Sequence, residues 1–225
     1  MTGQIRDIQK SYGRHSVLRG VSFDAERGDA VGIVGANGSG KSTLLRVLAG
    51  ILKPQGGQFL WEGGDLLRSR SARQQTVAYV PQGTPLIDEL SALDNLRLWY
   101  APEALRASLE GGMLRELGIQ EFLRTPASRL SGGMRKRLSI GCAISSDPRI
   151  LLLDEPTAAL DLAARERLLE YFFSFRARGG LILLATHDLR ELSACSRCVM
   201  LRGGVAEPYF FDGDAQKLAR ELETP

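Results

Sequence analysis

Few features of this sequence point toward a membrane span, a secretion signal or a nucleic acid. No apolar run reaches the length of about 20 residues that a membrane-spanning helix needs, and the longest runs, such as 150–153 and 181–184, have the length of buried strands. Residues 1–7 lack a basic segment followed by an apolar one, so we expect no signal peptide and a cytoplasmic chain. A net charge of +3 is too small to favour nucleic acid.

Cysteine and clustered charge are also scarce. Cys142, Cys195 and Cys198 are an odd number and form no disulfide framework, and the C-x-x-C spacing of the last two lacks the second pair or histidine cluster that a four-ligand zinc site needs. We therefore expect no metal or redox chemistry there. Two short basic runs, Arg68–Arg73 and Arg135–Arg137, are interpreted as solvated helix or loop faces rather than DNA contacts.

What is present is an alternation of strand and helix signals, which is typical of a layered α/β fold. The 225 residues suffice for one large domain, 1–225, with a sizeable core. Residues 58–61 and 76–80 are predicted as strands of a mostly antiparallel region, and 85–147 as a helical subdomain, because apolar residues there recur at helical spacing. Further along, Leu168, Leu169, Phe172 and Phe173 are predicted to form the inner face of an amphipathic helix.

A glycine-rich segment lies between a predicted buried strand, 30–34, and a short predicted helix, 41–49, which Gly50 ends. Residues 35–42 match G-x-x-x-x-G-K-[ST], the P-loop pattern, in the context where it binds phosphate: backbone N–H groups and the helix dipole face the anion. Lys41 is expected to reach the β- and γ-phosphates, and Ser42 to bind Mg²⁺. The alternative is a simple turn before a helix. The predicted nucleotide-binding residues here are Gly35, Ala36, Asn37, Gly38, Ser39, Gly40, Lys41, Ser42 and Thr43.

Two acidic residues follow the apolar run at 150–153. Asp154, at the carboxyl end of a predicted central strand, is expected to hold hydrated Mg²⁺, and Glu155 to orient and deprotonate the water that attacks the γ-phosphate. An apolar run that ends in Asp-Glu is weak by itself, because such runs are common. After a P-loop it is a strong indication of an ATPase.

Further motifs occur in a fixed order along the chain. Leu130 and Ser131–Gly133 precede a helix rich in Arg and Lys. Together with the other motifs of the chain, they resemble the motifs of ATP-binding cassette (ABC) ATPases. These other motifs are Tyr12, the P-loop, Gln82 after residues 79–81, Asp154–Glu155, residues 159–161 and His187. The resemblance covers essentially the whole chain. It implies a P-loop NTPase fold, namely an ABC nucleotide-binding domain with an antiparallel β subdomain and a helical subdomain.

The resemblance also implies roles for single residues. Tyr12 would stack on adenine; the alternative is a tyrosine packed in a small sheet. Gln82 would sense the metal or the attacking water where a transmembrane partner docks, and His187 would contact the γ-phosphate. Ser131, Gly132 and Gly133, with Asp161 shaping the interface, would bind the γ-phosphate held by a second subunit. Two domains, identical copies being the simplest case, would close head to tail around ATP and Mg²⁺.

Met134 stands where many relatives have glutamine, and with the basic residues that follow it resembles the ABC-2 exporter-type subfamily. The function expected is an ATPase subunit that energises export through a transmembrane permease, at the cytoplasmic face of the cell membrane, with no nucleic-acid partner. The alternatives are an importer subunit and, less favoured, a soluble ABC ATPase that acts on DNA or the ribosome. Residues 44–130 are too short a segment for the coiled coil of repair-type members.

Overall fold

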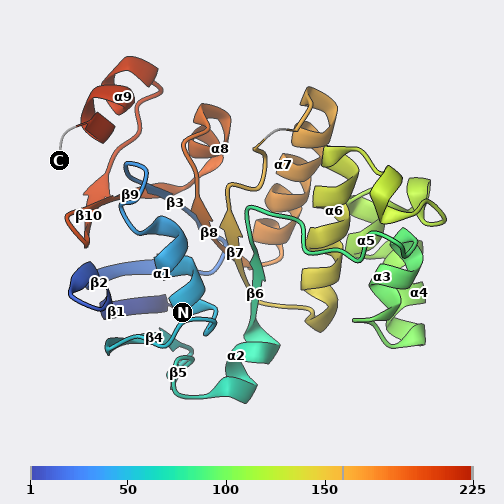
Figure 1. Cartoon of the computed structure of the whole chain (residues 1–225), viewed down its shortest axis with the longest axis horizontal. Coiled ribbons are helices and arrows are strands. Elements are labelled where there is room, and N and C mark those ends of the chain that lie inside the picture. The colour runs from blue at the N-terminus through green and yellow to red at the C-terminus, as the bar shows by residue number, and fades with distance from the viewer. Residues whose placement is uncertain (1, 159, 224–225) are drawn as a thin grey trace.

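Two β-sheets and their helices fill the left and centre of Figure 1, and a group of helices fills the right. The computed structural model describes residues 2–158 and 160–223. The strands are β1 (Thr2–Tyr12), β2 (His15–Glu26), β3 (Ala30–Val34), β4 (Gly56–Trp61), β5 (Gly64–Asp65), β6 (Val77–Val80), β7 (Ile150–Asp154), β8 (Leu181–Ala185), β9 (Arg197–Arg202) and β10 (Val205–Tyr209). The predicted strands at 30–34, 150–153 and 181–184 are therefore confirmed.

The helices fall between and after these strands. They are α1 (Lys41–Leu48), α2 (Arg70–Thr76), α3 (Ala92–Arg97), α4 (Pro102–Gly111), α5 (Met113–Glu116), α6 (Gly132–Ala143), α7 (Leu162–Ala177), α8 (Leu189–Ala194) and α9 (Ala215–Glu223), with short 3₁₀ turns η1 (Ile119–Phe122), η2 (Ala127–Arg129) and η3 (Ile144–Ser146). None of the helices in 2–158 and 160–223 is both long enough and apolar enough to cross a bilayer.

The smaller sheet is antiparallel, in the order β2-β1-β4-β5. A two-residue turn joins β1 to β2, where Tyr12 pairs with His15 and Gly13 takes a φ of 58°. Positive φ is the backbone that a tight hairpin turn requires, so glycine fits there. The antiparallel part of the predicted fold is confirmed.

The larger sheet has the order β10-β9-β3-β8-β7-β6. Its strands run parallel except β10, which pairs antiparallel with β9. The prediction that residues 76–80 belong to the antiparallel region is wrong, because β6 pairs in parallel with β7, from Val77 opposite Ile150. The physical reason is α2, which carries the chain from the small sheet to the edge of the large one, so that β6 enters in the direction of β7.

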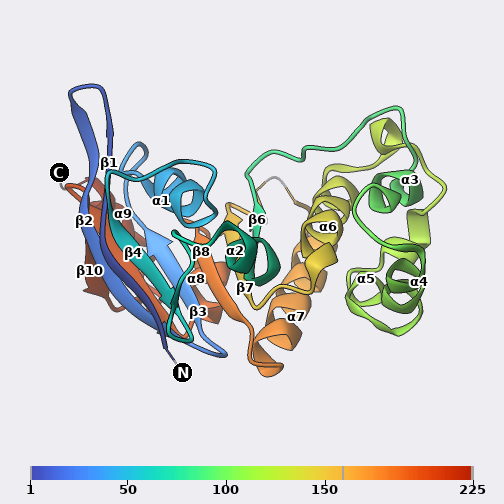
Figure 2. The same cartoon turned by 90° about the horizontal axis from the view of Figure 1, so that it is seen from below.

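Residues of β7 and β8 alternate between two cores, as side chains of a strand must. Ile150 and Leu152 pack with α1 and the antiparallel sheet, whereas Leu151 and Leu153 pack with α6 and α7 on the opposite face. Figure 2 shows the same layering, with α1 near β1 and β4, and α6 and α7 beyond β7. Because both faces are covered, these strands are apolar throughout.

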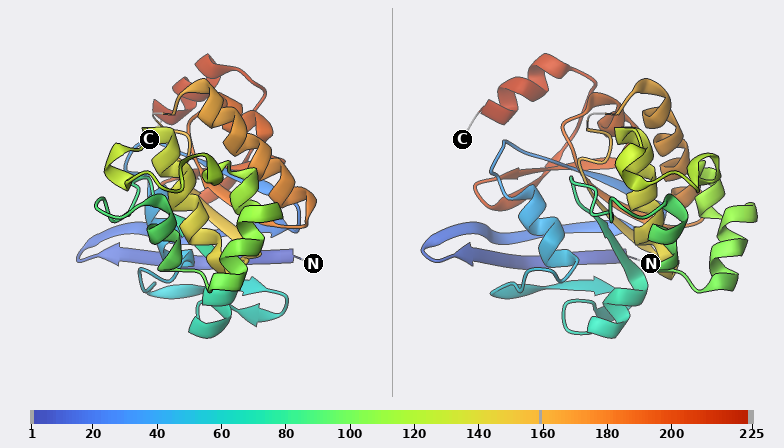
Figure 3. Two further views of the ribbon diagram at one scale, coloured as in Figure 1. Left: turned by 90° about the vertical axis from the view of Figure 1, so that its right-hand side faces the viewer. Right: turned by 45° about the vertical axis from the view of Figure 1, so that its right-hand side comes forward.

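Every regular element described between β6 and β7 is a helix or a 3₁₀ turn. Helices α3–α5 lie at the end of the molecule opposite β1 and β2 (Figure 3). On α7, Leu168 and Phe172 are buried as predicted, but Phe173 is 73% exposed, so its assignment to the inner face is wrong. Tyr171 and Phe175 are buried instead, because at 3.6 residues per turn they share the face of Leu168 and Phe172.

Candidate functional site

The P-loop connects the end of β3 to the start of α1. Gly40 is the N-cap of α1 with a φ of 106°, and no side chain caps this helix end. A Cβ atom on Gly40 would lie 2.9 Å from Val17 Cγ1, and one on Gly35 would lie 2.6 Å from the Leu201 carbonyl oxygen. These two positions therefore require glycine, and the uncapped N–H groups of α1 remain available for an anion.

Lys41 is the first residue of α1 and is only 8% exposed. Its ammonium group donates to the carbonyl oxygens of Gly35, at 2.6 Å, and Ala36, at 3.1 Å. Burial lowers the pKa of Lys41, while the nearby Glu155 and Asp154 carboxylates act in the opposite direction. A positive charge is thus held inside the loop that would receive phosphate.

Asp154 ends β7 and is 3% exposed. The Ser42 hydroxyl donates to Asp154 Oδ1 at 3.0 Å, so the two predicted metal ligands are brought together although 112 positions separate them. The Tyr79 hydroxyl donates to Asp154 Oδ2 at 3.3 Å. Tyr79 was given no role from the sequence; its place at the end of β6, next to β7, positions it on this carboxylate.

Glu155 follows Asp154 with a φ of 46°, an unusual backbone for a residue with a side chain. Its N–H donates to the Ala185 carbonyl oxygen at 2.9 Å, which fixes this turn against the end of β8. Gln82 Nε2 donates to Glu155 Oε2 at 2.9 Å, and His187 Nδ1 lies 3.3 Å from Glu155 Oε1. These two contacts bring the three predicted catalytic side chains together. The positive φ of Glu155 costs about 1–3 kcal/mol, and backbone strain of this kind is typical of functional sites.

A polar cavity of about 380 Å³ joins these residues to the P-loop. The residues that line it are Asn37, Gly38, Gly40, Lys41, Ser42, Thr43, Gln82, Glu155 and His187. Its floor is the N-terminus of α1, and its wall carries a carboxylate, an amide and an imidazole. Such a cavity suits a multiply charged phosphate chain and a water molecule beside it.

Tyr12 and residues 131–133 lie outside the lining of this cavity. Tyr12 is 48% exposed at the end of β1, with Lys10 Nζ 5.3 Å from its ring centroid. An exposed ring of this kind is free to stack, so the alternative reading of a tyrosine packed within the small sheet loses support. Stacking on adenine itself remains a prediction.

Ser131 is the N-cap of α6, and its Oγ accepts from the Met134 N–H at 3.2 Å. A Cβ atom on Gly133 would lie 2.6 Å from the Ala164 Cβ atom of α7, so glycine allows the two helices to approach. Asp161 caps α7, where Oδ1 accepts from the Ala164 N–H at 2.8 Å. Ala159, part of the motif at 159–161, lies outside the described residues.

The interpretation of the basic run at 135–137 as a solvated face is wrong. Lys136 and Arg137 are 3% and 6% exposed, and their side chains end on backbone carbonyl oxygens. Burial lowers the pKa of Lys136 to about 8, although the charges of Asp154, Glu191 and Glu155 oppose this shift. The charge of these residues does not predict that they are buried. Their position on the helix directly after residues 131–133 is the feature from which burial could have been predicted.

Glu191 is a second buried charged residue that the sequence did not indicate. It is 1% exposed on α8, and its Oε1 accepts from the Thr157 N–H at 3.1 Å. Burial raises the pKa of its carboxyl group. Glu191 thus connects the helix that follows His187 to the turn that follows Glu155.

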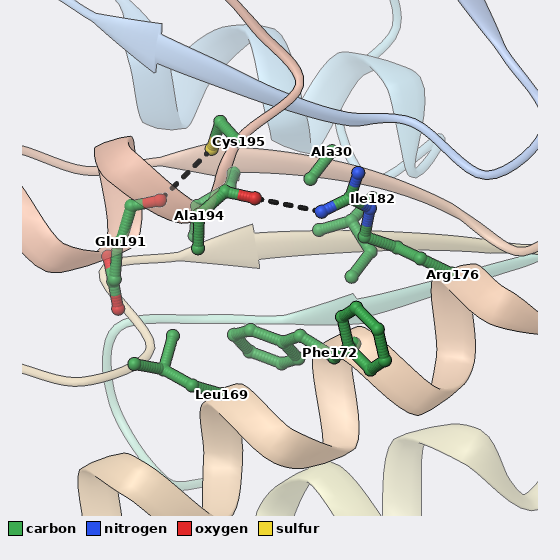
Figure 4. A pocket seen from close by; sticks show the side chains of 10 residues that line it. Ala30, Leu169, Phe172, Arg176, Ile182, Glu191, Ala194 and Cys195 are labelled. Atoms are coloured by element: carbon green, nitrogen blue, oxygen red, sulfur yellow. Dashed lines mark hydrogen bonds between the residues drawn. The ribbon is translucent and has the colours of Figure 1, made fainter.

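Figure 4 shows Glu191 at one side of an apolar cavity of about 260 Å³ between α7 and the large sheet. Arg176 Nη1 donates to the Ala194 carbonyl oxygen at 2.8 Å, and Cys195 Sγ donates to the Glu191 carbonyl oxygen at 3.2 Å. These two contacts fix the C-terminal end of α8, the helix that follows His187.

Cys142, Cys195 and Cys198 are free thiols, and no cluster of three or more potential metal ligands occurs within 2–158 and 160–223.

Comparison with known proteins identifies the family of the chain. Residues 18–158 match the sequence profile of the family described as ABC transporter. The chain is 33% identical over 221 residues to the macrolide export ATP-binding/permease protein MacB of Syntrophobacter fumaroxidans, covering 91% of this chain and 31% of that protein. It is 31% identical to the lantibiotic transport ATP-binding protein SrtF of Streptococcus pyogenes, covering 84% and 81% of the two chains.

A solved structure resembles the whole fold. The dimeric post-hydrolysis state of the ATP-binding cassette MJ0796, bound to ADP and Pi, superposes with a TM-score of 0.80 at 27% identity and covers 91% of this chain and 96% of that one. The chain thus spans most of SrtF and of MJ0796 but less than a third of the length of MacB.

Proposed function

The chain belongs to the ABC transporter family, and we propose that it binds and hydrolyses ATP to drive the export of a substrate through a separate permease. The observation that carries the proposal is the meeting of Gln82, Glu155 and His187 at the rim of the P-loop cavity. We take residues 1–225 as one nucleotide-binding domain, with a helical subdomain at roughly 85–147.

The phosphates of ATP would lie in the P-loop, residues 35–43, against the N–H groups of α1 and the Lys41 ammonium group. Lys41 would exchange its contacts with the Gly35 and Ala36 carbonyl oxygens for phosphate oxygens. Glu155 would accept a proton from the attacking water, which Gln82 and His187 orient. General-base help of this kind contributes about 10²–10⁴ in rate. Tyr12 would stack on adenine.

Mg²⁺ fits the polar groups beside Lys41. Ser42 Oγ and Asp154 Oδ1 lie 3.0 Å apart, and Gln82 lines the same cavity. Mg²⁺ in proteins keeps several waters and binds through one or two carboxylates plus substrate phosphates, so a set of few protein ligands is the pattern expected. Ser42, Asp154 and Gln82 would hold the ion, which supplies neutralising charge to the phosphates.

Ser131, Gly132 and Gly133 lie at the start of α6 and outside the P-loop cavity, which supports a role toward another subunit. We propose that this end binds the γ-phosphate held by a second nucleotide-binding domain, in the simplest case an identical copy, with Asp161 at the interface. ATP would close the pair and hydrolysis would release it. MJ0796, similar in fold, is described as a dimer bound to ADP and Pi.

The permease would dock beside Gln82, where a cavity of about 400 Å³ is lined by Tyr79, Pro81, Pro85 and Trp99. Trp99 is 64% exposed there, as suits an aromatic anchor at an interface. The domain would then lie at the cytoplasmic face of the membrane, attached through its partner. Export is favoured because the similar proteins MacB and SrtF are described as export and transport proteins.

The test is the purified chain and its Glu155→Gln variant. The wild type is expected to release phosphate from Mg-ATP. The variant is expected to bind ATP, to turn it over about 10²- to 10⁴-fold more slowly, and to form an ATP-dependent dimer that light scattering detects. A monomeric Glu155→Gln variant with wild-type turnover would contradict the assignment of the base.

A further inference from the structure

Lys136 lies on the second turn of α6, and its side chain enters the protein rather than the solvent. The residue is 3% exposed, and its Nζ donates to the carbonyl oxygens of Pro81, at 2.7 Å, and Gln82, at 3.1 Å. Burying an ammonium group is unfavourable unless strong acceptors surround it. The carbonyl oxygens of Pro81 and Gln82 are the acceptors that offset this cost.

Gln82 is held from two sides. Its backbone carbonyl accepts from Lys136 on α6, and its side-chain amide donates to Glu155 Oε2 at 2.9 Å. The preceding residue, Pro81, has a fixed φ and gives its own carbonyl to the same ammonium group. Two successive peptide units of the segment that follows β6 are thus fastened to one lysine of α6.

Arg135, the neighbour of Lys136, extends the attachment along the same segment. Its Nη2 lies 2.7 Å from Asp88 Oδ1, and its Nε donates to Thr84 Oγ1 at 3.4 Å. Residues 81–88 are therefore tied to α6 at several points. Ser131 precedes Lys136 by five positions, or about 7.5 Å along a helix axis, so both belong to one rigid element.

We propose that Lys136 is a positioning residue that couples the Ser131 end of α6 to the Gln82 side chain. The inference rests on the proposed function, in which this end of α6 binds a phosphate held by another subunit. When α6 shifts on that contact, the two hydrogen bonds of Lys136 move Pro81 and Gln82 with it. The shift adjusts how the Gln82 amide, already 2.9 Å from Glu155 Oε2, orients the attacking water.

The experiment is a double-mutant cycle on steady-state ATP turnover of the full chain. Lys136→Met keeps the length of the side chain and removes the donors. Its kcat is expected to fall about tenfold to a hundredfold, with the KM for ATP within about twofold of wild type, because misplacement of a catalytic group costs rate rather than binding. Lys136→Arg, which keeps donors for carbonyl groups, is expected to recover most of the rate.

The cycle uses Gln82→Ala as the second mutation. If Lys136 acts through Gln82, Lys136→Met has little further effect on kcat in the Gln82→Ala background. Arg137→Met is the matched control: it removes a buried cation of the same helix, whose Nη1 donates to the Leu117 carbonyl oxygen and not to residues 81–88. Its effect is expected to add to that of Gln82→Ala.

Additive effects of Lys136→Met and Gln82→Ala, or an unchanged kcat in Lys136→Met, would overturn the proposal. A second readout needs no turnover: amide hydrogen exchange of the peptide covering 81–88 is expected to be faster in Lys136→Met, and in Lys136→Gln should the first variant not fold. Unchanged exchange in a folded variant likewise contradicts the coupling. A wild type without ATP turnover would instead refute the proposed function, and the exchange experiment would still test the attachment.

Discussion

The N-terminal ends of α1 and α6 use their free backbone N–H groups in different ways. α1 begins after Gly40, with no side-chain cap, and its first residues face Asp154 and Glu155 within the same chain. α6 begins after Ser131, whose hydroxyl already accepts from an N–H of its own helix. The N–H groups at the α1 end are thus left for a ligand, whereas the α6 end already has a side-chain cap. Under the proposed function, the α1 end would bind ATP within one chain, whereas the α6 end would acquire a ligand only when a second subunit presents it.

The largest effect is expected at the α1 end. Lys41→Ala removes the charge that faces the phosphate cavity, and a hydrogen bond to a charged group contributes about 1.5–3 kcal/mol, so ATP affinity is expected to fall about tenfold to a hundredfold. Titration calorimetry of the single chain measures it. Arg106→Ala removes an exposed cation of α4 as a control and is expected to leave the affinity unchanged. Equal affinities of Lys41→Ala and wild type would mean that Lys41 does not bind phosphate.

An intermediate effect is expected at the α6 end. Ser131→Asp keeps an N-cap, since aspartate caps as well as serine, but places a negative charge where the phosphate of the other subunit would lie. Stability and the ATP affinity of the single chain are expected to stay near wild type, while ATP-dependent pairing in the Glu155→Gln background is lost. Light scattering and thermal unfolding measure the two quantities.

Ser131→Ala completes this comparison, because it removes the cap without adding charge. The variant is expected to lose about 1 kcal/mol of stability and to weaken pairing less than Ser131→Asp. If both variants pair as well as the chain with Ser131, the α6 end does not bind a phosphate of the other subunit.

The smallest effect is expected at a third helix end, that of α7. Asp161→Ala removes the acceptor for the Ala164 N–H and is expected to lower the free energy of unfolding by about 1 kcal/mol. Asp161→Asn keeps the cap and is expected to match wild-type stability, so any loss of ATP-dependent pairing in Asp161→Asn reports on the interface alone. Denaturant unfolding of both variants gives the stability difference.

The sequence predicted the parts of this site that are local in the chain. Glycine spacing and apolar periodicity predict the strand, loop and helix around the P-loop. The apolar run of the strand predicts the place of Asp154 at its carboxyl end. Prediction was poorer where periodicity is ambiguous: Phe173 was placed inside although it is 73% exposed, because one apolar face of a helix can be drawn in two ways from its sequence.

The burial of long polar side chains was also predicted wrongly. A run of Arg and Lys carries the same signal whether it faces water or backbone carbonyl groups, and the acceptors of Lys136 lie 54 and 55 positions away. The contacts of Tyr79 and Glu191 could not be predicted for a similar reason, since a tyrosine in a strand and a glutamate on a helix are ordinary until their partners are known.

By itself, the sequence determined which residue types are candidates for the proposed chemistry, because phosphate binding, metal binding and general-base roles depend on local spacing at the ends of strands and helices. Only the tertiary structure decided which of them meet. Gln82 reaches Glu155 across 73 positions because β6 lies in parallel beside β7, a pairing that the sequence pattern did not reveal. Such contacts depend on strand order, which is set by how the two cores pack and not by any short stretch of the chain.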